Sequence, residues 1–177
     1  MCTASPKGWI ELTQAQCLET LLAHFTRYYD VCRDVRPPFC AQALFHSREE
    51  HYFLTKTAKL AVYTSSERVY FATEGTLSPQ RLEELAACAW EQGLEGVSPF
   101  WGHKSSDVSL IVIAQSIDED AFRAAKRIRY YRSYRLSLFG WSAFALAAFD
   151  MGTHRCALNN RGRRLSKLFA PLATTSA

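Results

Sequence analysis

The chain has 177 residues, of which 48% are apolar, and a formal net charge of +4 at pH 7. This length predicts a single domain over residues 1–177, with a frayed tail at about 171–177, and the composition excludes a disordered chain. The opening "MCTASPKGWIELTQ" lacks the apolar stretch of a secretory signal. No apolar run reaches the roughly 20 residues that a membrane span needs, so we expect a cytoplasmic protein.

Three segments have the apolar spacing of a main helix, and a fourth is short and basic. Ser78 and Pro79 are typical of the first positions of a helix. Ser116 and Glu119 have the spacing of a capping box at the start of another. The predicted helices cover residues 13–33, 78–96, about 118–132 and about 163–169.

Segments rich in β-branched and aromatic residues indicate strands. Residues 39–74 predict a meander of three to four strands, and the apolar run "VSLIVIA" (108–114) is typical of a strand buried on both faces. Alternation over 134–139, then "SAFALAAFD" (142–150) and "HRCAL" (154–158), predicts further strands. We therefore expect an α+β fold, with a mixed, mainly antiparallel sheet packed with three main helices and a short C-terminal helix.

The charge is divided unevenly along the chain. Residues 1–120 hold ten basic and sixteen acidic residues, whereas residues 121–177 hold eleven basic residues and one acidic residue, Asp150. Arginine matches phosphate geometry, and the tyrosines of "KRIRYYRSYRLSLFGW" (126–141) can stack on unpaired bases. We expect this basic third to contact a polyanion such as nucleic acid, or an acidic protein. The expected contact residues, mostly on the outer face of the third helix, are Arg123, Lys126, Arg127, Arg129, Arg132 and Arg135, with Arg163 and Arg164 in support.

Other interpretations of the same segments stay open. The arginines could form a solvated surface or pair with the acidic part of the same chain. The run "LFGWSAFALAAF" (138–149), if it were an exposed edge strand or an apolar patch, would favour a homo-oligomer.

A catalytic alternative rests on histidines in predicted loops. His46 and His51 flank two glutamates in "HSREEH", and His103 and Asp107 precede the buried strand. No nucleophile lies beside them in sequence, and their spacing matches no standard metal site, so we predict neither a metal nor a cofactor.

The element order helix, three strands, helix, strand also matches the restriction-endonuclease-like fold, as an analogy. That family holds magnesium with an Asp and a Glu-x-Lys pair on adjacent strands. Here Glu67 is followed by Arg68 and Val69, so the pair is incomplete and metal catalysis is in doubt.

Six cysteines occur without a Cys-x-x-Cys pair or zinc-finger spacing, which predicts free thiols in a reducing compartment.

Residues 118–167 combine a basic helix, "GW" before a strand, an Asn-x-x-Gly turn and a basic end. This pattern resembles an uncharacterised prokaryotic domain family. The resemblance implies a prokaryotic origin and no particular activity, and the expected function is that of a non-catalytic binding or accessory protein.

Overall fold

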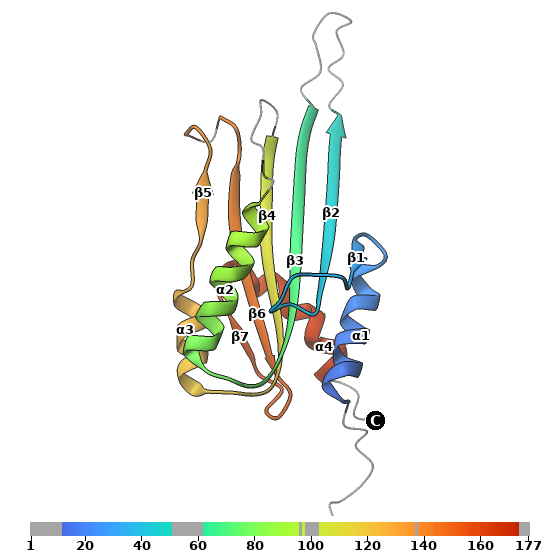
Figure 1. The fold of residues 1–177 in the computed structure, drawn as a ribbon, viewed down its shortest axis with the longest axis vertical. Helices are drawn as coiled ribbons and strands as arrows, with labels where there is room; N and C mark the ends of the chain where they lie inside the picture. The colour runs from blue at the N-terminus through green and yellow to red at the C-terminus, as the bar shows by residue number, and fades with distance from the viewer. Residues whose placement is uncertain (1–11, 51–61, 96, 98–102, 137, 174–177) are drawn as a thin grey trace, which may run out of the picture.

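A mixed sheet lies between two layers of helices. The structure, a computed structural model, describes residues 12–50, 62–95, 97, 103–136 and 138–173. Figure 1 shows α2 and α3 in front of the sheet and the C-terminal helices behind it. The elements in chain order are α1 (Gln14–Phe25), β1 (Asp30–Cys32), β2 (Ala41–Glu50), β3 (Val62–Leu77), α2 (Pro79–Leu94), β4 (His103–Ile117), α3 (Glu119–Arg127), β5 (Tyr131–Ser133), β6 (Trp141–Asp150), β7 (Cys156–Leu158), the 3-10 helix η1 (Arg161–Phe169) and α4 (Ala170–Ala173).

The seven strands have the order β1-β2-β3-β4-β6-β5, and β7 also pairs with β6. The long strands β3, β4 and β6 are parallel to one another, and the other four pairings are antiparallel. The helices α2 and α3 therefore serve as the connections that parallel strands require. The predicted α+β class, with a mixed and mainly antiparallel sheet, is confirmed.

Each face of the sheet has its own apolar core, because successive side chains on a strand point to opposite faces. Tyr70 and Leu110 pack with α2 and α3 on one face. Phe71 and Ile111, the next residues along the same strands, pack with α1 and η1 on the other. The predicted strand "VSLIVIA" is confirmed as the double-sided centre of the sheet. The predicted helix after Ser78 is confirmed as well, with the Ser78 side chain accepting from the Arg81 backbone N–H.

Two predicted helices are shorter in the structure, and a predicted strand is a turn. The first helix ends at Phe25, and its expected last turns instead include β1, which pairs with β2. The third helix starts at the N-cap Asp118, so the Ser116 cap was wrong, and it ends at Arg127. Residues 134–139 were predicted as a strand. The described residues among them, 134–136 and 138–139, form a turn in which Arg135 and Leu136 have φ angles of 47° and 55°.

The long strand β6 is buried along its length and lies between β4 and the pair β5 and β7. The premise that this segment is an exposed edge strand was therefore wrong, although a homo-oligomer stays a prediction. The region 39–74 was also divided too finely, because its described part forms just two long strands, β2 and β3. Residues 51–61 lie outside the described residues.

One buried side chain joins the last turn of the fold to the sheet. Asn159 is 2% exposed, and its Oδ1 accepts from the backbone N–H groups of Leu146 (3.0 Å) and Gly162 (2.6 Å). Its Nδ2 donates to the carbonyl oxygens of Ile128 and Phe144, both at 3.1 Å. Gly162 lies so close to β6 that a Cβ atom there would stand 1.8 Å from the Leu146 carbonyl oxygen.

Replacing Gly162 with alanine should destabilise the fold by about 4 kcal/mol or more, because backbone atoms of β6 occupy the space that the methyl group needs. The matched control is Gly75→Ala, where the new Cβ would meet nothing within 4 Å. Urea unfolding of the two variants checks this expectation. Equal midpoints for Gly162→Ala and Gly75→Ala would contradict it.

Candidate functional site

The predicted basic residues do not form one helical stripe. Because α3 ends at Arg127, the set divides among three elements. One group lies on α3, one follows it along β5 at the edge of the sheet, and one lies on η1, which packs on the opposite face from α3. The groups are Arg123, Lys126 and Arg127; Arg129, Arg132 and Arg135; and Arg163 and Arg164, all of them exposed.

Pairing with the acidic part of the chain accounts for some of these arginines. Arg123 pairs with Asp120 on α3, and Arg164 donates to Glu67 at 2.6 Å. Arg155, outside the predicted set, pairs with Glu119. By contrast, neither Arg132 nor Arg135 forms an ion pair with a carboxylate in the described part of the chain.

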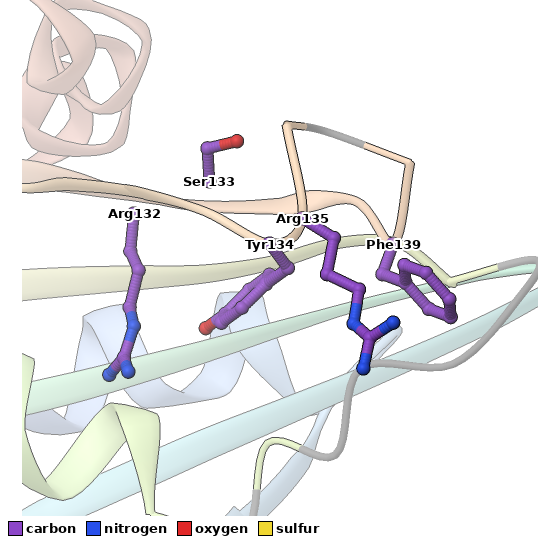
Figure 2. Close-up of a pocket in the computed structure, with 5 residues that line it drawn as sticks. All are labelled: Arg132, Ser133, Tyr134, Arg135 and Phe139. Carbon is purple, nitrogen blue, oxygen red and sulfur yellow. The ribbon is translucent and has the colours of Figure 1, made fainter.

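Arg132 and Arg135 line a hollow at the end of β5, which we call the arginine pocket. Its volume is about 420 Å³, and its lining residues are Arg132, Ser133, Tyr134, Arg135 and Phe139. Figure 2 shows four of these side chains on one side of the backbone, with Ser133 on the other. The Arg132 guanidinium lies 5.7 Å from the centre of the Tyr134 ring, and that of Arg135 lies 5.2 Å from the Phe139 ring. The pocket therefore presents two cations, each beside an aromatic face.

Backbone hydrogen bonds hold the turn that carries this pocket. The Tyr134 N–H donates to the Gly140 carbonyl at 3.0 Å, and the Phe139 N–H donates to the Tyr134 carbonyl at 3.2 Å. The Tyr134 hydroxyl is 2.9 Å from the Ser142 hydroxyl of β6. The turn is thus tied both across its ends and to the sheet, which fixes the Tyr134 side chain relative to β6.

A second polar cluster lies on the α1 and η1 face of the sheet. Glu67 of β3 accepts from the Tyr29 hydroxyl (2.8 Å), the Ser109 hydroxyl (2.7 Å) and Arg164 (2.6 Å). A hollow of about 300 Å³ adjoins it, lined by His24, Phe25, Tyr28, Tyr29, Glu67, Arg164, Leu165 and Leu168.

Asp107 belongs to this cluster, because β3 and β4 pair in parallel with Glu67 opposite Asp107. Its Oδ1 is buried without a hydrogen-bond partner. Burial raises the pKa of the Asp107 carboxyl; Arg164 opposes this rise and Glu67 adds to it. The two neighbouring carboxyl groups therefore differ in their surroundings. Glu67 accepts several hydrogen bonds, whereas Asp107 has a buried oxygen without a donor.

The catalytic alternative placed His46, His103 and Asp107 in loops, but the structure places them in strands. His103 begins β4, and Asp107 lies within that strand rather than in a loop. His46 lies in β2, opposite Ser66, and His51 falls outside the described residues. Among the residues that the structure describes, no three His, Cys, Asp or Glu side chains gather as a metal site. Where the endonuclease analogy needs a lysine, Val69 is buried in the apolar core.

Sequence reasoning missed the pairing of Glu67 with Asp107. Asp107 comes directly before the apolar run "VSLIVIA", and Glu67 is separated from the run "VYFA" by Arg68 alone. Both point to the same face as the buried residues two positions on. The place of Glu67 and Asp107 near the start of an apolar run is the signal that could have paired these two residues, had the register of β3 and β4 been known.

A family model described as a domain of unknown function, DUF8052, matches residues 13–171. The chain belongs to the DUF8052 family. This confirms the expected membership of an uncharacterised domain family and extends it well beyond residues 118–167. No curated protein and no solved structure matched the chain. The Asn-x-x-Gly turn that carried the resemblance is the Asn159–Gly162 junction, so in this DUF8052 domain that motif is structural.

The Asp107→Asn variant should be more stable than the natural chain at pH 7. A carboxyl group whose pKa is raised by folding stabilises the fold only while it is protonated, so its contribution is lost as pH rises from about 4 through the raised pKa. The variant should lack this loss and gain about 1 kcal/mol at neutral pH, because a neutral amide costs less to bury than a carboxylate.

Unfolding free energies measured from pH 4 to pH 8 check this expectation. Asp34→Asn, at an exposed aspartate, is the control. A stability difference between the Asp107→Asn variant and the natural chain that does not grow with pH would show that the Asp107 carboxyl is adequately solvated.

Proposed function

We propose that this DUF8052 protein is a non-catalytic binding protein that holds a phosphate-bearing polyanion in the arginine pocket. The observation that carries the proposal is the pair Arg132 and Arg135, two exposed guanidinium groups that share one hollow without a carboxylate partner in the described chain. Such groups bind phosphate oxygens through charge-assisted hydrogen bonds.

The surroundings of the pocket support the same function. Arg129 and Arg127 precede it along the edge of the sheet and are exposed, so a chain of phosphates could extend from the pocket toward α3. Tyr134 and Phe139 hold their rings beside the two guanidinium groups, which limits the orientations that these cations adopt. Nucleic acid is therefore the first polyanion to test, and an acidic protein surface is the alternative.

The place of action that we propose is the cytoplasm of a prokaryotic cell. Five cysteines in the described part of the chain, Cys17, Cys32, Cys40, Cys88 and Cys156, are free thiols, which is typical of a reducing compartment. No helix among the described residues is long and apolar enough to cross a membrane.

The Arg132→Gln/Arg135→Gln variant should bind labelled oligonucleotides at least tenfold more weakly than the natural chain at about 50 mM salt, and its dependence of log K on log salt should be shallower by about 2. The reason is that each arginine lost removes one phosphate contact. Fluorescence anisotropy with single-stranded and duplex probes between about 50 and 200 mM salt measures both quantities.

The matched control is Arg163→Gln/Lys167→Gln on η1, which changes the net charge equally on the opposite face. If both variants lose affinity equally, binding follows net charge and not the arginine pocket. If the natural chain binds no probe at about 50 mM salt, nucleic acid is excluded as the polyanion.

A further inference from the structure

Two leucines protrude beside the arginine pocket, and phosphate binding does not explain them. Leu136 is 95% exposed and Leu138 is 62% exposed. We call the described residues 134–136 and 138–140 the leucine turn. An isolated exposed leucine is ordinary on a protein surface. Two within three residues lie next to two arginines that have no carboxylate partner among the described residues. Together they form a local amphipathic feature, and such features mark interaction sites.

The backbone holds these leucines at the surface. Leu136 has a φ angle of 55°, and Arg135 before it has 47°, a left-handed conformation that residues other than glycine, asparagine and aspartate adopt at a cost. The Leu138 N–H donates to the Arg135 carbonyl at 3.1 Å and closes the tip of the turn. The exposure of Leu136 and Leu138 is therefore part of an ordered, hydrogen-bonded structure.

The leucine turn lies at the end of the sheet where β6 begins, the upper end in Figure 1. The helices α1 and α4 lie toward the other end in the same view. The leucines and the cations of the arginine pocket therefore lie at the same end of the sheet, which β2 and β3 also reach.

We propose that the polyanion is the surface of an anionic lipid bilayer. This inference rests on the proposed binding of a polyanion at the arginine pocket. In this arrangement Leu136 and Leu138 enter the boundary between headgroups and acyl chains, while Arg132 and Arg135 bind headgroup phosphates. A bilayer offers apolar and anionic groups one above the other, which matches the two kinds of side chain in the leucine turn. A nucleic acid would use the arginines and leave the leucines in water.

Membrane binding of this kind combines two weak interactions, electrostatic attraction of the arginines and insertion of the leucines. Each basic residue near an anionic membrane strengthens binding about fivefold, and neither charge nor a small apolar insertion anchors a protein firmly alone. The association would be peripheral and reversible, and it would weaken as salt screens the arginines.

The test is sedimentation of the full chain with vesicles of phosphatidylcholine alone and of phosphatidylcholine mixed with phosphatidylserine. We expect salt-sensitive binding to the mixed vesicles. Leu136→Asn/Leu138→Ser should weaken it about tenfold, since asparagine tolerates the left-handed conformation and keeps the turn folded. Arg132→Gln/Arg135→Gln should weaken it about fivefold for each arginine lost. Tyr28→Ser, at an exposed tyrosine on α1's side of the fold, is the matched control and should bind normally.

The outcomes separate the two proposals. Arginine-dependent binding to oligonucleotides without binding to vesicles would overturn the lipid partner and keep the arginine pocket as a polyanion site. Vesicle binding that is unchanged in Leu136→Asn/Leu138→Ser would overturn insertion of the leucine turn. Absence of binding to both vesicles and oligonucleotides would overturn the lipid proposal and leave an acidic protein as the remaining partner.

Discussion

The buried side chain of Asn159 is the constraint on which the arrangement of both helical layers depends. Its amide makes four hydrogen bonds, two to β6, one to Ile128 at the C-cap of α3 and one to the start of η1. A buried amide that is fully satisfied stabilises one arrangement, because any shift leaves a polar group without a partner. Asn159 thereby fixes where α3 stops on one face of the sheet and where η1 begins on the other.

Both candidate sites follow from this junction. Since the Ile128 carbonyl is bound by Asn159, the chain leaves α3 there and continues into β5, which places Arg132 and Arg135 at the sheet edge. On the opposite face, η1 starts close against Leu146 and brings Arg164 to Glu67. One amide thus separates basic residues of the C-terminal third. Arg132 and Arg135, which have no carboxylate partner in the described part of the chain, lie at the edge, and Arg164, which pairs with Glu67, lies over the second face.

The sequence predicted those elements whose signals are local. The apolar run of β4 and the Ser78–Pro79 start of α2 identify themselves within a few residues. The end of α3 does not, because the apolar period of Phe122 and Ala125 continues through Ile128 and Tyr131, and the group that stops the helix is 31 residues away in sequence. The Glu67–Asp107 pair was hidden for the same reason, since only the register of two strands 40 positions apart brings these side chains together.

Arg132 and Arg135 have no carboxylate partner in the described chain, and several nearby acidic residues are engaged elsewhere in the fold. Asp150 is the sole carboxylate side chain after residue 120, and it is 2% exposed. Its oxygens accept from the backbone N–H groups of Ile117 (2.9 Å) and Thr153 (2.8 Å), where it joins the end of β4 to the turn after β6. That position is at the opposite end of β6 from the arginine pocket (Figure 1). Asp150 is therefore committed to the fold, and two acidic residues of α3 are engaged as well, since Asp120 pairs with Arg123 and Glu119 pairs with Arg155. This leaves the charge of the sheet edge to be neutralised by a more distant part of the chain or by a partner.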